Sequence, residues 1–336
     1  VVLASNKVSS SASATISYSD TYLTNSGAVT IDGDNGVNVS ATDDAIITST
    51  IELSSTSSTD NSSPFSNSDS VGVSAGFALN EVRGGAAASI DDATVTASGG
   101  NIAITALENA TLTADLTSEA ESSGGSQFGS GTSFTGGGLI ATNSLQSGAT
   151  AYVANSSLTN TSSTVDVDNG NIQVSADNTA TLDASVVNAV TTGDTGIAVT
   201  LAFNSIGWET QNVLFSAVDA LIGDPLLADE AFGNNNGANA TVYLLDSTAD
   251  AIGNVDVSAR VGANLTSDIS NTTSSEASAL RGATGASFGV VLASNKVSSS
   301  ASATISYSDT YLTNSGAVTI DGDNGVNVSA TDDAII

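Results

Sequence analysis

The sequence predicts an all-β fold: a parallel β-solenoid, or β-helix, of stacked degenerate repeats with one loop or helix insertion. Three observations lead to this prediction. Residues 290–336 repeat residues 1–47 without a change, three short sequence blocks recur in a fixed order, and apolar residues alternate with polar ones inside every block. Alternation with a period of two is typical of strands with one buried face, and recurrence of small units is typical of repeat architectures.

The identical segments define the domain organisation. Their offset is 289 residues, so residues 1–289 form one full tandem period and residues 290–336 begin the next identical period. Inside the period we expect four sub-units at approximately 1–70, 71–133, 134–194 and 195–286, with an insertion at approximately 207–237. Tandem copies in a longer gene are the simplest source of such identity, and a cloning choice is the alternative.

The first block reads apolar-Ala-x-Asn-x-apolar and contains one asparagine in each copy. The asparagines are 74, 63, 61 and 91 residues apart. Buried asparagine side chains commonly satisfy backbone groups at turns, so we expect a structural role at the corners of the solenoid, with ligand binding as the alternative. The repeated asparagines are Asn6, Asn80, Asn143, Asn204 and Asn295.

Two further blocks supply most of the expected core. One reads Ala-x-Ala-x-(Ile/Val) and starts at Ala12, Ala86, Ala149 and Ala238; the other starts at Val37, Ile102, Ile172 and Val255. In the last block two apolar residues and an alanine are spaced two residues apart, and a second alanine follows four residues later, for example Ile102, Ile104, Ala106 and Ala110. The step of four between its alanines predicts a strand, a tight corner and a second strand.

The size of one coil is left open by these patterns. Coils of roughly 20–30 residues with about 4.8 Å of rise would make one period about 50–70 Å long, whereas one large coil per unit would make it shorter. A stack of antiparallel sandwich domains is the alternative architecture.

The insertion breaks the repeat and carries helix signals. Asp224 fits an N-cap, Pro225 the first helical position and Gly233 the residue after the end, which predicts a short helix. We expect a contact surface here, made of Trp208, Asp224, Pro225, Leu226, Leu227 and Phe232. The segments 54–70 and 122–138, rich in Ser and Gly, are predicted to be loops.

The order of the three blocks resembles the repeats of giant bacterial surface adhesins, the filamentous-haemagglutinin-like and leukotoxin-like filamentous adhesins. The resemblance covers nearly the whole chain except the insertion. It implies a secreted β-helical stalk on the bacterial cell surface that serves attachment or fibre formation.

Composition excludes several chemistries. The chain has no His and no Cys, so it contains neither a Ser-His-Asp nor a Cys-His catalytic site. Five basic residues against 35 acidic ones give a formal charge of -30, which disfavours nucleic acid, and no apolar run is long enough to insert into a membrane. The acidic pairs Asp43-Asp44 and Asp91-Asp92 are poor acid/base couples, because neighbours in a strand point to opposite faces. We therefore expect no enzyme.

One segment resembles the start of a cation-binding loop. Asp32, Asp34 and Asn35 lie in a Gly-containing run, and their oxygens suit Ca²⁺. The bidentate Glu that closes such loops is missing, so a polar turn is the main expectation and a weak Ca²⁺ site is the alternative. No other cofactor is expected.

The expected function is structural: a repeat segment of an extracellular cell-surface fibre or adhesin stalk that acts by length, rigidity and self-association. Its expected partners are further copies of itself, end to end or side by side, and cell-surface or matrix glycans. Two alternatives are a glycan-binding or glycan-cleaving β-helix and an ice- or mineral-binding surface. Each has a direct assay, namely glycan binding, sugar release or thermal hysteresis.

Overall fold

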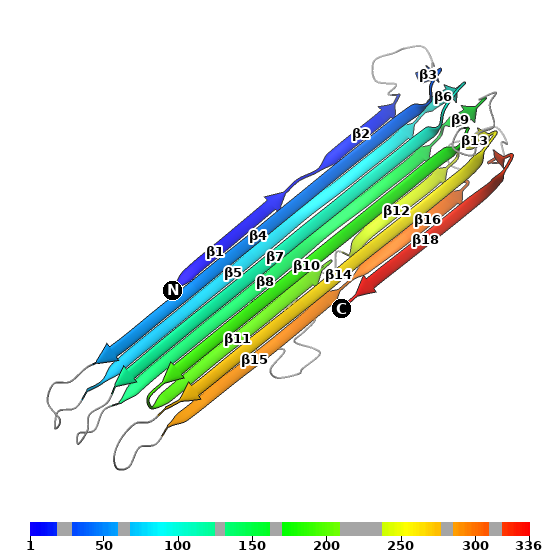
Figure 1. The fold of residues 1–336 in the computed structure, drawn as a ribbon. Coiled ribbons are helices and arrows are strands. Elements are labelled where there is room, and N and C mark those ends of the chain that lie inside the picture. Colours follow the sequence, from blue (N-terminus) through cyan, green and yellow to red (C-terminus); the bar gives the residue numbers. More distant parts are fainter. Residues whose placement is uncertain are drawn as a thin grey trace.

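The computed structural model describes residues 1–18, 29–59, 68–124, 132–161, 170–208, 237–276, 285–308 and 318–336. These residues form strands and no helix, and every pair of neighbouring strands is parallel. The strands make three sheets that run side by side through the stack (Figure 1). The predicted all-β parallel solenoid is confirmed.

Two sheets are broad and one is narrow. Sheet A contains β1 (Val2–Ser9), β2 (Ala12–Ser17), β5 (Ser70–Asp91), β8 (Ser133–Ala154), β11 (Thr195–Ile206), β12 (Ala238–Leu245), β15 (Ala286–Val297) and β16 (Ser299–Ser306). Sheet B contains β3 (Val29–Gly33), β6 (Ala93–Ala97), β9 (Ser157–Asn160), β13 (Thr248–Ala251) and β17 (Ile320–Gly322). Sheet C contains β4 (Val37–Thr59), β7 (Ile102–Gly124), β10 (Ile172–Thr192), β14 (Asn254–Ser275) and β18 (Gly325–Ile335).

The chain visits the sheets in the order A, B, C and then returns to A one level further along the stack. Coil 1 comprises β1 to β4, coil 2 β5 to β7, coil 3 β8 to β10, coil 4 β11 to β14 and coil 5 β15 to β18. Long strands of sheets A and C therefore lie on opposite sides of a thin interior, and the arrows of the two sheets point in opposite directions in Figure 1.

Each repeat unit is one large coil. Asn6, Asn80, Asn143, Asn204 and Asn295 occupy the same position in successive coils. Of the two coil sizes that the sequence left open, the structure shows the large one. A strand of 22 residues such as β5 spans about 70 Å across the stack, whereas four coils rise only about 19 Å along it. One period is a wide, thin slab rather than a slender rod.

The interior is made of small apolar side chains at alternate positions. In β7 the residues Ile102, Ile104, Ala106, Ala110 and Leu112 are all buried, and the residues directly next to them in the strand face outward. Strand β7 continues through the two alanines to Gly124, so the predicted corner inside this block is wrong. The position between the alanines also faces inward, which makes it a buried site in every coil.

The real corners lie at the two ends of sheet B. Between sheets A and B the chain turns at Asp92, Asn155 and Asp246, which have φ of 53°, 49° and 51°. Asp and Asn tolerate this left-handed conformation better than other residues with a side chain. Between sheets B and C the turn uses glycines, for example Gly36 and Gly100 with φ of 101° and 79°.

Parts of the predicted loops are strand. Strand β4 extends to Thr59 and β7 to Gly124, while β8 begins at Ser133. The middle of each predicted loop, and the predicted helix between Asp224 and Gly233, lie outside the described residues.

Coil 5 continues the stack without a break. Strand β15 pairs with β11 from Ala286 to Val297, and β18 pairs with β14 from Gly325 to Ile335, both in uninterrupted parallel register. Coil 5 carries the sequence that coil 1 carries. The start of a second period therefore packs on the end of the first as one coil packs on another.

Candidate functional site

A ladder of asparagine side chains runs through the interior along the whole stack. We call the five residues Asn6, Asn80, Asn143, Asn204 and Asn295 the asparagine ladder. Each Nδ2 donates to the Oδ1 of the next coil, at 3.1, 2.9, 2.9 and 3.0 Å in sequence. The amides all point the same way, so each hydrogen bond polarises its neighbours.

The ladder is also bonded to the opposite sheet. The second N–H of Asn80 donates to the Thr113 carbonyl at 3.1 Å, and that of Asn143 donates to the Asp183 carbonyl at 2.8 Å. The expected backbone partners are therefore present, but the residues lie in mid-strand and not at corners. A one-residue slip of any strand would leave buried amides unpaired, so the ladder fixes the register.

A second asparagine ladder occupies the corner between sheets B and C, and it was missed from sequence. Asn101 Oδ1 accepts the backbone N–H of Asn171 at 3.0 Å, and Asn171 Oδ1 accepts that of Asn254 at 2.8 Å. The residues directly precede the third sequence block in three coils. Their fixed position before that block is the signal that could have identified them.

The inward position between the alanines of sheet C faces a matching position of sheet A in every coil. Ser147 donates to Asn178 Oδ1 at 2.9 Å in coil 3, and Ser299 donates to Asp332 Oδ1 at 2.8 Å in coil 5. In coil 2 the two residues are Gly84 and Glu108; a Cβ at Gly84 would lie 2.9 Å from the Glu108 carboxyl carbon. Glycine is needed there because the longer glutamate fills the space. The residues at this sheet A position in successive coils are Ser10, Gly84, Ser147, Ala238 and Ser299, and those at the sheet C position are Asp43, Glu108, Asn178, Val261 and Asp332.

Glu108 and Asp43 form a buried carboxyl pair. They are paired residues of β7 and β4, and both are buried, Glu108 completely. The backbone N–H of Gly85 donates to Asp43 Oδ2 at 2.9 Å. Burial, the charge of Asp43 and a hydrogen bond to Asp43 raise the pKa of Glu108 to about 8, with a smaller contribution from Asp44. At neutral pH Glu108 is therefore protonated.

The identical segments show how this aspartate behaves with and without its glutamate neighbour. Asp43 pairs with Glu108, whereas its copy Asp332 pairs with Val261. Asp332 accepts the Ser299 hydroxyl with both oxygens, at 2.8 and 3.0 Å, while the equivalent Ser10 Oγ has no partner among the described residues. Within this chain Asp43 has only a following coil and Asp332 only a preceding one, and this difference accounts for their different partners.

The carboxyl pair is enclosed between the sheets, so a polymeric substrate cannot reach it. Of the acidic pairs seen in the sequence, Asp43 faces inward and Asp44 outward, as predicted for strand neighbours. Asp91 ends β5, and Asp92 is the corner residue. Neither sequence pair forms a facing acid/base couple.

The candidate Ca²⁺ residues lie at the corner between β3 and β4. Asp32, Asp34 and Asn35 are exposed, and the Gly36 N–H donates to the Gly33 carbonyl at 3.2 Å, which closes a tight turn. Over the described ranges, no group of three acidic side chains is arranged to hold a metal ion. The geometry is that of a polar turn, and the Ca²⁺ alternative stays a prediction for a binding experiment.

Of the predicted contact surface only Trp208 is described. The Lys296 ammonium lies 3.4 Å from the centre of the Trp208 ring, on the outer side of sheet A. This cation–π contact joins coil 4 to coil 5. The residues Asp224, Pro225, Leu226, Leu227 and Phe232 lie outside the described residues.

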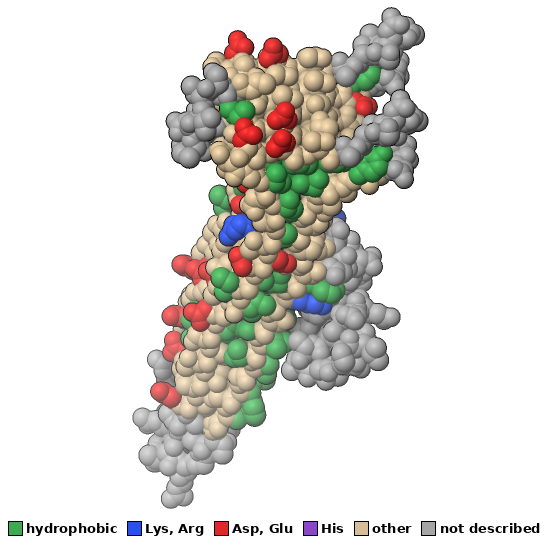
Figure 2. Space-filling model, turned by 90° about the vertical axis from the view of Figure 1, so that its right-hand side faces the viewer, with side chains coloured by type: hydrophobic (Ala, Val, Ile, Leu, Met, Phe, Trp, Pro, Cys, Tyr) green, Lys and Arg blue, Asp and Glu red, His purple; other side chains and the backbone are tan. Residues whose placement is uncertain are grey.

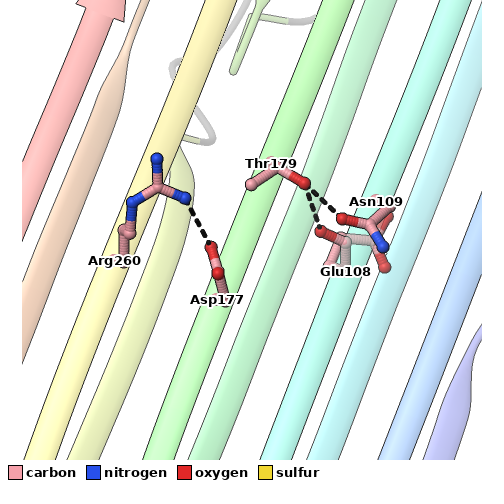
Figure 3. Close-up of polar contacts among 5 residues, drawn as sticks. All are labelled: Glu108, Asn109, Asp177, Thr179 and Arg260. Atoms are coloured by element: carbon pink, nitrogen blue, oxygen red, sulfur yellow. Dashed lines mark hydrogen bonds and ion pairs between the residues drawn. The ribbon is translucent and has the colours of Figure 1, made fainter.

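The outer surface of sheet C is polar and acidic. Figure 3 shows two contacts that join neighbouring coils there: Arg260 bonds Asp177 at 3.5 Å, and Thr179 donates to Asn109 and to the Glu108 carbonyl. The outward acidic residues of this surface are Asp44, Glu52, Asp115, Glu119, Glu121, Asp177, Asp183, Asp256 and Asp268.

No protein-family model, curated protein or solved structure matches the chain. The resemblance to filamentous adhesin repeats therefore stays an expectation from the sequence blocks. Within the described residues no helix is long and apolar enough to cross a membrane.

Proposed function

We propose that this chain is a structural segment of an extracellular surface fibre or adhesin stalk. The observation that carries the proposal is the register between coil 4 and coil 5. Because coil 5 repeats the sequence of coil 1 and stacks as an ordinary coil, further identical periods can extend the same core.

The buried polar groups support a mechanical role. Both asparagine ladders run parallel to the direction of growth and bond successive coils. Together with the continuous backbone ladders of three sheets, they give a stack that resists bending and register slip. Rigidity and extension are the properties that a stalk needs.

The surface charge supports an extracellular setting. A formal charge of -30 keeps copies soluble at low ionic strength and is screened in salt water or body fluids. Glycans of the cell surface or matrix are the external partners that we propose for such a fibre, and the bacterial cell surface is the proposed location.

The test is to locate the protein on its source cells. Antibodies against residues 1–289 should label elongated structures outside the cell in electron micrographs. Label confined to compact particles or to the cell interior would contradict the proposal. Release of reducing sugars from polysaccharides by the purified period, absent in a variant of an outward carboxylate such as Asp44→Asn, would favour the enzyme alternative instead.

A further inference from the structure

We propose that the apolar half of the outer face of sheet A is the interface through which two copies of this chain associate side by side. The inference rests on the proposed fibre function, because it names the surface that self-association would use. The partner is a second copy, facing the first with the same sheet.

The surface, which we call the apolar face, spans the first half of β5, β8 and β11 together with β15. Two of its large side chains are exposed although a coil lies on each side of them, Phe134 by 38% and Ile197 by 39%. Val71, Val73 and Phe288 are exposed by 62%, 57% and 60%, and each lies where a described coil flanks it on one side only. Val73 and Ile197 stand in line with Phe288 across coils 2, 4 and 5. The outward residues of these strands include Val71, Val73, Ala75, Phe77, Phe134, Ile140, Ile197, Val199, Phe288, Val290 and Leu292.

Charge favours a copy of the same face as the occupant. No acidic residue lies among these outward positions, and the charges begin at their end, where Lys7 bonds Glu81 at 2.6 Å and Arg83 bonds Glu81 at 3.0 Å. The outer face of sheet C carries the acidic side chains instead. Figure 2 looks at the side of the molecule where coil 5 ends the stack, and there Asp and Glu lie along one margin of the lower part and hydrophobic side chains lie away from that margin.

Two copies that meet by their apolar faces keep both acidic faces in solvent. Any pairing that uses the outer face of sheet C places like charges at the interface, which is unfavourable. An apolar surface bordered by ion pairs also has the usual layout of a protein interface, with an apolar centre and a charged rim.

The area sets how strong the association is. Nine residues along a strand, from Val71 to Leu79, and four coils cover at most about 600 Å², with about 3.3 Å per residue and about 4.8 Å per coil. The free part of this area is smaller, because Leu201 and Phe203 on the same outward face are only 6% exposed. A stable interface buries about 800 Å² on each partner. One period should therefore associate weakly, and a chain of two tandem periods should associate far more tightly because the two patches act together.

The main experiment is sedimentation equilibrium of one-period and two-period chains at 0.05 and 0.5 M NaCl. The test variant is Val73→Glu with Ile197→Glu, and the matched control is Thr48→Glu with Thr111→Glu on the outer face of sheet C, which adds the same charge. We expect the test variant to weaken the side-by-side dimer about 100-fold and the control to change it less than about 3-fold. Salt should strengthen the dimer, since it screens the net charge.

A second measurement separates this interface from end-to-end stacking. The chain has no cysteine, so Val73→Cys introduces a single thiol. It should give a disulfide-linked dimer on oxidation, whereas Thr48→Cys should not.

Equal loss of association in both glutamate variants, or equal cross-linking from both thiols, would overturn the inference. So would monomers that bind neutral phosphatidylcholine vesicles through this face in preference to each other. If two-period chains form one continuous stack while the dimer is absent, only the inference fails. If the two periods form separate particles joined by a linker, the proposed function fails.

Discussion

Replacing Glu108 by glutamine should make the protein much less sensitive to alkaline pH. Burial beside Asp43 raises the pKa of Glu108 from 4.5 to about 8 in the folded state. In the unfolded chain the group ionises near 4.5, so between pH 4.5 and 8 the unfolded state binds fewer protons than the folded state. Linkage then requires the free energy of unfolding to fall as pH rises through this interval.

The size of the effect follows from the shift. At about 1.4 kcal/mol per pKa unit the upper limit is about 5 kcal/mol, and we expect about 2–4 kcal/mol because the protein around the ionised group relaxes and screens part of its charge. Glutamine has the same shape and its N–H can donate to Asp43 as the protonated carboxyl does. Glu108→Gln should therefore match the parent protein near pH 5 and exceed it in stability by this amount at pH 9.

The assay is urea unfolding followed by circular dichroism at pH 5, 7 and 9. The control is Glu119→Gln, a residue on the outer face of the same strand, which should leave the pH dependence unchanged. Parallel curves of unfolding free energy against pH for the parent and Glu108→Gln would refute the reasoning.

Four further predictions concern the ladders, the facing pair and the corners. Asn143→Ala should lower the free energy of unfolding in urea by about 2–5 kcal/mol, because it leaves the Asn80 N–H and the Asn204 oxygen buried and unpaired. The control Asn264→Ala, at an exposed position, should cost less than about 0.5 kcal/mol, and equal losses in the two variants would contradict the ladder. Gly84→Ser should destabilise the protein by about 1–3 kcal/mol, measured by calorimetry, because the added side chain collides with Glu108. Adding Glu108→Asn should restore stability, since the double variant copies the Ser147/Asn178 pair; if the double variant instead shows the sum of the two single losses, the steric match is disproved. Asn155→Val should lower the free energy of unfolding by about 1–2 kcal/mol and Asn155→Gly by less, because valine is strained at a φ of 49° and glycine is not. A lower melting temperature for the glycine variant than for the valine variant would contradict this account of the corner. EDTA should leave the melting temperature unchanged if Asp32, Asp34 and Asn35 form only a polar turn, and a drop that Ca²⁺ reverses would establish the cation site.

The sequence predicted the strands, their buried faces and the stacked repeats. It could do so because the alternation of apolar and polar residues is a local property of one strand. Val37, Ile102, Ile172 and Val255 were aligned from sequence alone, and they are neighbours in sheet C.

The size of the coil could not be predicted in the same way. Two short strands joined by a corner and one long strand have the same period of two, and only the pairing partner distinguishes them. The step of four from Ala106 to Ala110 was therefore taken for a corner, although it marks the inward Glu108 between them. A charged residue on the buried face of an otherwise apolar strand was the signal that was missed.

The corners were missed for a related reason. Asp92, Asn155 and Asp246 are separated by irregular distances, and each is a common surface residue. Their shared left-handed conformation becomes visible only when the coils are aligned in space. The ladder residue Asn143 was recognised as a repeat but placed at a corner, because its opposite partner, the Asp183 carbonyl, comes from a distant part of the chain.

The central claim is that each period adds four large coils to one continuous stack. Small-angle X-ray scattering and electron microscopy of chains with one, two and four tandem periods measure this growth directly. The account predicts a constant cross-section about 70 Å wide and an increase in length of about 19 Å per period. An increase of about 50–70 Å per period, or separate beads joined by linkers, would contradict it.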